Sequence, residues 1–379
     1  MTYLNILISG SSGFIGKNLV QSLKYQYKIF RYDILLHNSS DSTIIKKLEK
    51  ADYLIHLAGV NRPANLKDFK DNYRFTKKIC DFLILKKKKL PIIFSSTAHI
   101  GKKSSNKNKL LINYVNSKID SETVLINFAK LMNVKLDIFR IPHVIGKFAK
   151  PNYNSVIATF CYKILRNQPV NISKEDPRLN IVHVDSLVNN FINIILKKKN
   201  TISIDYHRPK QFQIRVSEIA DKINKMKFSI DNNHIYQISD DFEKILYSTL
   251  ITYLPKKNIK KKLNFKKDKR GIFSEILKSK NFGQISFFTS INNLKRGNHY
   301  HNIKFEIFVV VSGVAEYCSV SLNSKNKKVK YILKGSDPTI IRTIPGDKHY
   351  IKNIGKKELI VLVWANENFD VNNPDTFLA

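Results

Sequence analysis

The chain has 379 residues and 43% hydrophobic content, enough for two or three domains, yet its longest apolar runs, such as residues 307–311, are too short to span a bilayer. No secretory signal pattern opens the chain, and its three cysteines are too scattered for a disulfide framework or a cysteine metal site, so we expect a cytoplasmic protein. The formal net charge of +35 is spread along the whole chain, as AT-biased codon usage produces, and we therefore expect no nucleic-acid partner.

Up to about residue 200, short apolar runs alternate with segments of helical period. Such alternation predicts an α/β fold, a Rossmann-type doubly wound parallel sheet with helices on both faces. The predicted strands are 5–8, 28–32, 53–57, 91–95 and 136–140. The predicted helices lie near 14–25, 65–87 and 114–131.

The first predicted strand leads into a glycine-rich loop, Ser-Gly-Ser-Ser-Gly-Phe-Ile-Gly, at residues 9–16. The first glycine permits a tight turn, the second lets the backbone approach a pyrophosphate, and the third lets helix and strand pack closely. The N-terminus of the following helix attracts phosphate charge. This loop therefore predicts a dinucleotide site, with cofactor contacts at Gly10, Ser12, Gly13, Phe14, Ile15 and Gly16.

The second predicted strand ends at Asp33. A carboxylate at this position usually accepts hydrogen bonds from the adenosine ribose, which favours NAD. Arg31, two residues earlier, could instead meet the 2′-phosphate of NADP. Both residues are predicted cofactor contacts, and the choice between NADH and NADPH stays open.

Tyr114 and Lys118 lie one helical turn apart on one face of the predicted helix 114–131. A lysine cation beside a phenol lowers the pKa of the phenol, so Tyr114 can relay a proton to or from a carbonyl oxygen. Thr97 follows the predicted strand 91–95, where its hydroxyl can bind the same carbonyl. We predict Thr97, Tyr114 and Lys118 as catalytic residues, and the latter two also as cofactor contacts.

The residue pattern of the chain changes near residue 271, where short β-rich runs begin. Residues 246–270 contain Pro255 and a Lys/Asn-rich stretch with little apolar periodicity, which is typical of a linker. The short β-rich runs that follow predict an antiparallel barrel or sandwich. We expect a nucleotide-binding domain over 1–245, a linker over 246–270 and an all-β domain over 271–379. The predicted strands of the last are 284–289, 307–311, 314–320, 328–333, 339–344 and 358–364.

The all-β part carries metal-ligand residue types at a spacing that resembles the cupins. The residues are His299, His301, Glu306 and His349. Alternate residues of a strand point to one face, so the first two histidines can both face the interior. The set offers the nitrogen and oxygen donors that Zn²⁺ or another divalent metal takes. Pro345 directly precedes Gly346, which shortens the usual cupin turn and could shift His349.

Residues 1–245 resemble the extended short-chain dehydrogenase/reductase family, on the glycine loop, Thr97 and the Tyr114–Lys118 pair. The resemblance implies that the segment His-Leu-Ala-Gly at 56–59 lines the cofactor, with contacts at Leu57, Ala58 and Gly59. It also implies that Asn72 is the helix-borne asparagine of that family. Arg178, shortly before His-Val-Asp at 183–185, matches the segment near the nucleotide-sugar diphosphate.

A second resemblance overlaps the cupin pattern. Residues 268–275, Gln284 and 296–300 are similar to the nucleotide-linked 4-keto-6-deoxysugar epimerases. The resemblance implies that His299 is the base that removes a proton α to a ketone. His299 is therefore either a base or a metal ligand, and both roles stay open.

Over its whole length the chain resembles the bifunctional UDP-2-acetamido-2,6-dideoxy-β-L-talose reductase family, CapF/WbjC type, of capsule and O-antigen biosynthesis. The most specific stretches are 59–63, 150–164, 246–249 and 369–377. The resemblance implies a homodimer and a UDP-linked 4-keto-6-deoxysugar substrate. The cupin domain would epimerise C3 of a UDP-2-acetamido-2,6-dideoxy-4-hexulose, and the first domain would reduce the C4 ketone with NADPH, or NADH, on the route to UDP-N-acetyl-L-fucosamine. Predicted substrate contacts are Lys150, Asn152, Tyr153 and Arg178.

Two other functions stay open. In the first, the chain is only a 4-ketosugar reductase, and its cupin is a structural or dimerisation module. In the second, an inactive reductase fold senses nucleotide sugars or binds nucleic acid, which would require the loss of Tyr114 or Lys118. Both residues are present.

Overall fold

The computed structural model describes residues 3–101, 108–197, 202–323 and 327–378. The chain forms two compact units, Met1–Asn224 with Ile238–Pro255, and Lys225–Gln237 with Lys256–Ala379. The predicted linker range 246–270 contains the end of α8 (Asp241–Ile251), η2 (Lys256–Asn258) and β10 (Lys266–Asp268). The domain limits taken from the sequence stay a prediction.

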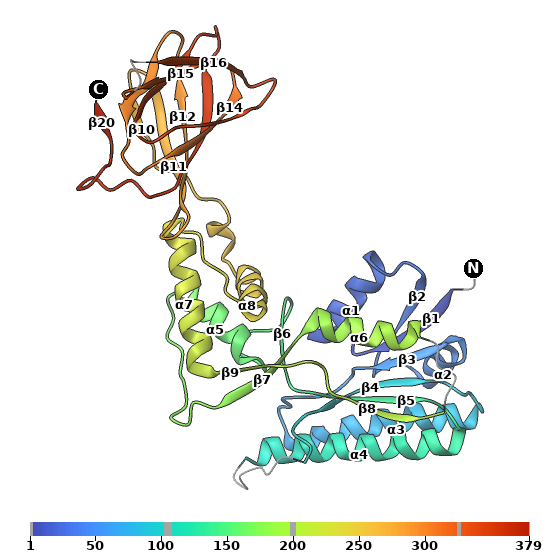
Figure 1. Cartoon of the computed structure of the whole chain (residues 1–379). Coiled ribbons are helices and arrows are strands. Elements are labelled where there is room, and N and C mark those ends of the chain that lie inside the picture. The colour runs from blue at the N-terminus through green and yellow to red at the C-terminus, as the bar shows by residue number, and fades with distance from the viewer. Residues whose placement is uncertain (1–2, 102–107, 198–201, 324–326, 379) are drawn as a thin grey trace. The chain divides into compact units, whose positions relative to one another are not determined.

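A parallel sheet of six strands forms the centre of the first unit (Figure 1). Its spatial order is β2 (Phe30–Leu35), β1 (Leu4–Ser9), β3 (Tyr53–His56), β4 (Ile92–Thr97), β5 (Leu136–Ile141) and β8 (Ile204–His207). All neighbouring strands pair in parallel. The chain order reverses between β1 and β3, and open α/β sheets bind ligands beyond the carboxyl ends of the strands at such a point.

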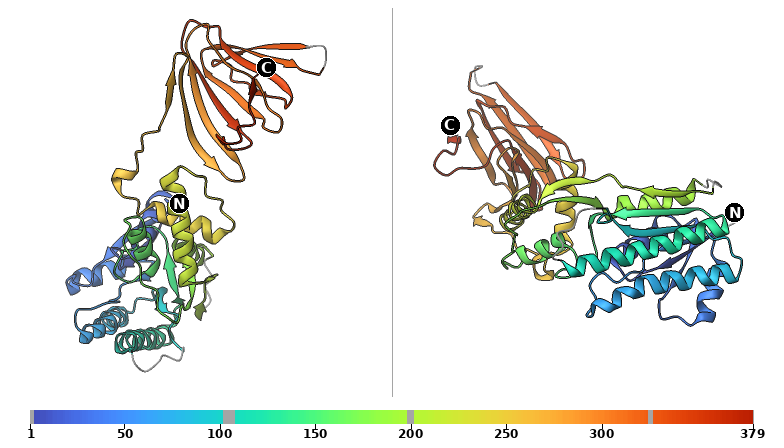
Figure 2. Two further views of the ribbon diagram at one scale, coloured as in Figure 1. Left: turned by 90° about the vertical axis from the view of Figure 1, so that its left-hand side faces the viewer. Right: turned by 90° about the horizontal axis from the view of Figure 1, so that it is seen from below.

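Helices cover both faces of this sheet (Figures 1 and 2). On one face lie α2 (Asp41–Lys50), α3 (Lys70–Leu85) and α4 (Lys109–Met132). Their apolar side chains pack on Leu54, Phe94 and Leu136 of the strands. On the other face lie α1 (Phe14–Tyr25) and α6 (Val184–Leu196), which pack on Ile8 and Phe139.

A smaller sheet and further helices complete the first unit. The sheet contains β6 (His143–Ile145), β7 (Arg178–His183) and β9 (Phe212–Arg215). The other elements are η1 (Leu66–Phe69), α5 (Val156–Ile164) and α8, while α7 (Val216–Asn232) has residues in both units. None of the helices among the described residues combines the length and apolar character that a membrane span needs.

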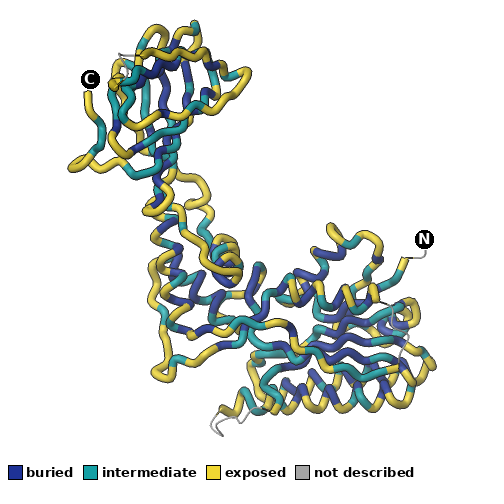
Figure 3. Tube along the Cα trace, viewed as in Figure 1, coloured by how far each residue is buried: buried dark blue, intermediate teal, exposed yellow. Residues whose placement is uncertain are grey.

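The second unit consists of two antiparallel sheets around a core that includes Phe308, Tyr317 and Val361 (Figure 3). The first sheet orders β10, β11 (Gly271–Ser279), β12 (Gly283–Ser290), β19 (Leu359–Ala365), β14 (Glu306–Ser312) and β17 (Ile340–Arg342). The second orders β16 (Lys328–Lys334), β15 (Val314–Ser321), β18 (Asp347–Asn353), β13 (Lys295–Tyr300) and β20 (Phe377–Leu378).

The predicted fold class, a doubly wound parallel sheet followed by an all-β part, is confirmed. Two details are wrong. Asp33 lies inside β2 and not at its end, since the strand continues to Leu35. Helix α4 begins at Lys109, because Asn108 caps it by accepting a hydrogen bond from the backbone of Leu111, so Tyr114 lies within the helix and not at its start.

The sequence patterns also miss elements with little apolar content. Helix α2 buries only Ile44 and Leu48, although Ser40 is a clear N-cap that accepts from the backbone of Thr43. Strand β18 reads Asp-Lys-His-Tyr-Ile-Lys-Asn, and its charged residues hide the strand pattern.

Candidate active site and metal centre

The glycine loop lies between β1 and α1, at the reversal point of the sheet. Gly10 has φ +76°, and a Cβ there would lie 2.6 Å from the backbone nitrogen of Ala58. A Cβ at Gly16 would lie 2.2 Å from the carbonyl oxygen of Gly10. The loop thus packs on both the helix and the segment after β3, and only glycine fits at these two positions.

The first turn of α1 is suited to an anion. Gly13 is its N-cap residue and offers no side-chain cap, and no acidic residue lies in the first turn. The backbone N–H groups of this turn therefore lack a side-chain acceptor within the helix start, and the helix dipole favours negative charge there. The predicted contacts Ser12, Phe14 and Ile15 belong to this same loop and turn.

The carboxylate of Asp33 is paired with a residue that the sequence analysis missed. Lys47 of α2 donates to Asp33 Oδ1 at 2.8 Å and to the carbonyl oxygen of Ile34 at 2.7 Å. Burial opposes ionisation of Asp33, but the hydrogen bonds from Lys47 and the Ile34 N–H prevail and lower the pKa of Asp33. Arg31 lies over the ring of Tyr3 at 4.8 Å. The spacing of residues along the sequence could not have identified Lys47, because Asp33, its partner, lies on a different element.

Thr97 and Tyr114 meet beyond β4. Thr97 is buried at the carboxyl end of that strand, and its Oγ1 accepts from the backbone N–H of His99 at 3.3 Å. Burial raises the pKa of Tyr114 to about 12, and a hydrogen bond with Thr97 only partly offsets this rise. The expectation of a lowered pKa for Tyr114 is therefore wrong for this structure, because desolvation of the phenolate outweighs the effect of the Lys118 charge.

Lys118 is buried beside the segment that was predicted to line the cofactor. Its Nζ donates to the carbonyl oxygen of Ser95 at 2.9 Å and lies 4.8 Å from the ring centre of Phe94. A Cβ at Gly59 would lie 3.0 Å from the same Nζ. Burial lowers the pKa of Lys118 to about 8, and the Glu122 carboxylate opposes the drop.

Glu122, one turn after Lys118, is the second residue that the sequence analysis missed. Its carboxylate accepts from Arg140 at 2.7 Å and from the hydroxyl of Ser96. Ser96 lies between Ser95 and Thr97, so this buried group connects α4 to the end of β4. An acidic residue one turn after the Tyr-x-x-x-Lys pair was a visible signal for it.

Asn72 joins α4 to the segment after β3. Its Oδ1 accepts from the backbone N–H of Val60 at 2.6 Å, and its Nδ2 donates to Ser117 Oγ at 3.0 Å. His56 instead lies in the core, where Ser9 and Thr76 contact its two ring nitrogens at 2.5 and 2.9 Å. Burial lowers the pKa of His56 to about 3, so this ring is neutral and structural.

The predicted substrate residues lie on the surface of the first unit. Lys150, Asn152 and Tyr153 belong to the loop before α5, and the Lys150 ammonium lies 5.6 Å from the ring centre of Tyr153. Asn152 has φ +54°, and its N–H donates to Thr159 Oγ1 at 2.9 Å. Arg178 is exposed at the start of β7. The first three therefore form one group, and Arg178 reaches the surface from a different element.

In the second unit, the four predicted metal ligands come together. Their donor atoms all lie within 4.8 Å of one another. The Nε2 atoms of His301 and His349 lie 3.6 and 3.5 Å from Glu306 Oε2. His299 is directly opposite His349 in the β13–β18 pair, and their ring centres are 4.9 Å apart. The shortened Pro345–Gly346 turn therefore leaves His349 in the cluster.

A β-bulge in β13 lies directly before His299. The pairing with β18 shifts register between Gly297 and His299, and both Gly297 and Asn298 have positive φ. The extra residue of a bulge redirects the side chains that follow it. A Cβ at Gly297 would lie 2.9 Å from the carbonyl oxygen of His349, so the close approach of the two strands requires glycine there.

The chemistry of the cluster fits a divalent metal. The Nε2 atoms of His299, His301 and His349 are buried and have no hydrogen-bond partner among the described residues. Burial, together with the other two histidines, lowers the pKa of His299 to about 4, so its ring is neutral. Burial opposes ionisation of Glu306, but the neighbouring His301 and His349 rings hold the pKa of this carboxyl well below its usual range. Neutral imidazoles and a carboxylate are the donor set of zinc sites.

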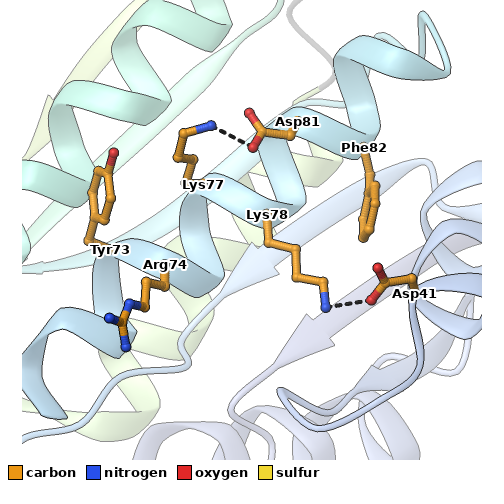
Figure 4. Close-up of a pocket in the computed structure, with 7 residues that line it drawn as sticks. All are labelled: Asp41, Tyr73, Arg74, Lys77, Lys78, Asp81 and Phe82. Atoms are coloured by element: carbon orange, nitrogen blue, oxygen red, sulfur yellow. Dashed lines mark hydrogen bonds and ion pairs between the residues drawn. The ribbon is translucent and has the colours of Figure 1, made fainter.

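A depression on the surface between α2 and α3 is separate from these residues (Figure 4). Its cations are already paired, since Lys77 contacts Asp81 at 2.6 Å and Lys78 contacts Asp41 at 2.5 Å. It is lined by Asp41, Tyr73, Arg74, Lys77, Lys78, Asp81 and Phe82. None of the predicted site residues belongs to this lining, and we assign it no function.

Comparisons with known proteins cover both units. Residues 6–206 match the NAD dependent epimerase/dehydratase family, and residues 266–377 match the polysaccharide biosynthesis C-terminal domain. A Pseudomonas aeruginosa protein described as UDP-2-acetamido-2,6-beta-L-arabino-hexul-4-ose reductase is 31% identical over 99% of this chain and 98% of its own length. The crystal structure of the capsular polysaccharide assembling protein CapF from Staphylococcus aureus is 33% identical, covers 99% of both chains and has a TM-score of 0.84.

A more distant structure is similar to part of this chain in fold alone. It is a UDP-glucose 4-epimerase from Thermotoga maritima, with 18% identity, a TM-score of 0.53 and coverage of 68% of this chain and 100% of its own.

Proposed function

Because the chain belongs to the NAD dependent epimerase/dehydratase family and is similar over its whole length to the hexulose reductase and to CapF, we propose that it is a reductase of a UDP-linked 4-keto-6-deoxysugar in polysaccharide biosynthesis. One observation carries the proposal. Tyr114 contacts Thr97 at the carboxyl end of β4, and Lys118 of the same helix donates to the Ser95 carbonyl oxygen of that strand. The same unit holds the glycine loop, at the reversal point of the sheet, before a helix start that has no side-chain cap.

The residues of this site divide the reduction between them. A reduced nicotinamide, when bound at the glycine loop, would supply a hydride for C4. Tyr114 is protonated at neutral pH, since its pKa is about 12, and can donate its proton to the ketone oxygen. Thr97 orients the carbonyl by a hydrogen bond. Lys118 is largely cationic below about pH 8 and stabilises the phenolate that forms. The hydride and the proton together convert the ketone to an alcohol.

The surroundings of Asp33 support NADPH as the cofactor. A free carboxylate at this position repels a 2′-phosphate, but here Lys47 and Asp33 form an ion pair at 2.8 Å. Lys47 offsets the negative charge and can share its ammonium with the phosphate, with Arg31 two residues away in β2. This arrangement favours NADPH over NADH.

We further propose that the second unit epimerises C3 of a UDP-2-acetamido-2,6-dideoxy-4-hexulose before the reduction, on the route to UDP-N-acetyl-L-fucosamine. The C4 ketone acidifies the C3–H, so a base can remove this proton and return one to the opposite face. A divalent ion in the cluster would polarise the ketone. The convergence of His299, His301, Glu306 and His349 favours His299 as a ligand, and a role as the base is the alternative.

The test follows deuterium from D₂O into C3 of the 4-hexulose by mass spectrometry, first without nicotinamide and then with NADPH. We expect uptake without cofactor and a reduced product with NADPH. Tyr114→Phe should keep the uptake and lose reduction by a factor of about 10²–10⁴. His299→Ala should lose the uptake.

The outcomes separate the proposed activities. Reduction without any uptake would leave a 4-ketosugar reductase with a structural cupin. No reduction with either NADPH or NADH would contradict the reductase itself. If His299→Ala loses the uptake while it retains stoichiometric zinc, His299 is the base and not a ligand.

A further inference from the structure

The segment Asp370–Leu378, which we call the 370–378 strap, lies along the strand that carries His299. Its β20 residues pair with β13, with Phe377 opposite Tyr300 and Leu378 opposite His299. The rings of Phe377 and Tyr300 stack at 5.3 Å. The strap thereby forms the edge of the five-stranded sheet beside the metal cluster.

The carboxylate of Asp375 anchors this strap. It accepts three backbone N–H groups in succession, from Asn302 at 2.9 Å, Ile303 at 2.9 Å and Lys304 at 2.7 Å. These residues form the turn between the second metal histidine and Glu306. A carboxylate that accepts several backbone N–H groups holds a turn firmly, because charge-assisted hydrogen bonds are stronger than neutral ones.

Lys304 binds the strap from the opposite direction. Its side chain is buried, and its Nζ donates to the carbonyl oxygen of Pro374 at 2.7 Å and to Thr376 Oγ1 at 2.9 Å. The Lys304 ammonium therefore holds Pro374 and Thr376 against the turn. The Asp375 carboxylate holds Asp375 itself there. This double attachment determines where the backbone carbonyl of Asp375 lies.

That carbonyl oxygen contacts His301. The distance from Asp375 O to His301 Nδ1 is 2.5 Å. A carbonyl oxygen can only accept a hydrogen bond, so Nδ1 must carry the proton. In the neutral ring the lone pair is then on Nε2, the buried atom that lacks a partner among the described residues and faces Glu306 Oε2 at 3.6 Å.

We propose that the 370–378 strap, anchored by Asp375, is a positioning element that holds His301 as the Nδ1–H tautomer and aims its Nε2 at the divalent metal. This inference rests on the proposed metal centre. Asp375 acts through His301 and is not itself a ligand. Outer partners of this kind orient metal-bound histidines and raise metal affinity.

The test compares Asp375→Ala with the full-length protein and with Asp370→Ala. Asp370 is an exposed residue of the same strap, and among the described residues its carboxylate accepts from the nearby backbone N–H of Asn372 alone. Its substitution therefore matches the charge change without altering the turn. Zinc affinity is measured by competition with a chromophoric chelator. The tautomer is read in the metal-free, ¹⁵N-histidine-labelled protein by two-bond ¹⁵N–¹H NMR, with His301 assigned from His301→Gln.

We expect Asp375→Ala to weaken zinc binding by about 10–100-fold and to lose the pure Nδ1–H pattern of His301, whereas Asp370→Ala changes neither. If Asp375→Ala keeps both the affinity and the tautomer, the inference is wrong and the metal centre stands. If the unaltered protein binds no zinc, the metal centre fails. The NMR pattern then still decides whether the strap sets the tautomer, which a merely structural role would not change.

Discussion

At the scale of single residues, burial decides the charge states of the candidate reductase site. Tyr114 and Lys118 are one turn apart, yet the Lys118 ammonium contacts the carbonyl oxygen of Ser95, and the pKa of Tyr114 is raised. Of this pair, Lys118 has the pKa closer to neutral pH, at about 8. The pH dependence of the reaction should therefore report Lys118.

We expect kcat/KM for reduction to be level below about pH 8 and to fall above it, because Lys118 loses its proton there. The Glu122 carboxylate raises the pKa of Lys118, so Glu122→Gln should move this fall to lower pH. Initial rates between pH 6 and 9.5 give the apparent pKa of each protein, and the difference between the two pKa values is the displacement. One pKa unit corresponds to about 1.4 kcal/mol. An unchanged profile in a folded Glu122→Gln protein would count against this role of Lys118.

Lys47 supports a second prediction at this scale. Lys47→Ala should raise KM for NADPH about tenfold and leave KM for NADH within about twofold, because one ion pair with a 2′-phosphate is lost and NADH has no such group. Steady-state rates with each cofactor measure both constants. Lys46→Ala is the neighbouring control, and equal effects of Lys47→Ala on the two cofactors would contradict the assignment.

At the scale of elements, the β1–loop–α1 segment is a compact unit of backbone contacts. A Cβ at Gly16 would meet the Gly10 carbonyl oxygen at 2.2 Å and Ser11 Cα at 2.7 Å. At Gly13 the nearest atom, the Gly10 carbonyl oxygen, is 3.3 Å away, and the φ of −74° suits any residue. Substitution of Gly16 therefore tests the stability of the fold, and substitution of Gly13 tests ligand binding.

Gly16→Ala should destabilise the protein by more than about 2 kcal/mol, because backbone atoms must move. Gly13→Ala should destabilise the protein much less than Gly16→Ala, because a single contact at 3.3 Å has to relax, but it should weaken NADPH binding at least about tenfold, since its methyl group would approach the pyrophosphate. Thermal unfolding and fluorescence titration with NADPH give the two readouts. If Gly13→Ala binds NADPH as tightly as the unaltered chain, the phosphate does not lie at this loop.

At the scale of the whole molecule, the chain carries two sets of chemical groups in two compact units. The predicted reductase residues belong to the first unit, and the cluster of candidate metal ligands belongs to the second. If the proposed functions hold, loss of the metal should affect only one of the two reactions. The homodimer stays a prediction.

Removal of divalent ions with EDTA should abolish deuterium exchange at C3 but leave NADPH affinity and reduction of an already epimerised 4-ketosugar within about twofold. Zinc added back should restore the exchange, and circular dichroism shows whether the metal-free protein stays folded. Exchange that persists in a protein shown to be free of metal would remove the ion from the proposed reaction.

The sequence by itself determined the features that depend on local backbone geometry. The glycine loop, the strands around it, the one-turn spacing of Tyr114 and Lys118, and the alternation of His299 and His301 follow from the periods of helix and strand. The α/β class and the all-β continuation followed from the same periods. Only the tertiary structure decided which groups face each other across the chain.

Three contacts illustrate the difference. Lys47 meets Asp33, Lys118 meets the backbone of Ser95, and Asp375 meets His301 across 74 positions of sequence. The residue spacing of the sequence predicts none of these contacts, because a hydrogen bond between distant segments depends on how their elements pack. Desolvation likewise depends on packing, which is why spacing alone predicted the wrong direction for the pKa of Tyr114.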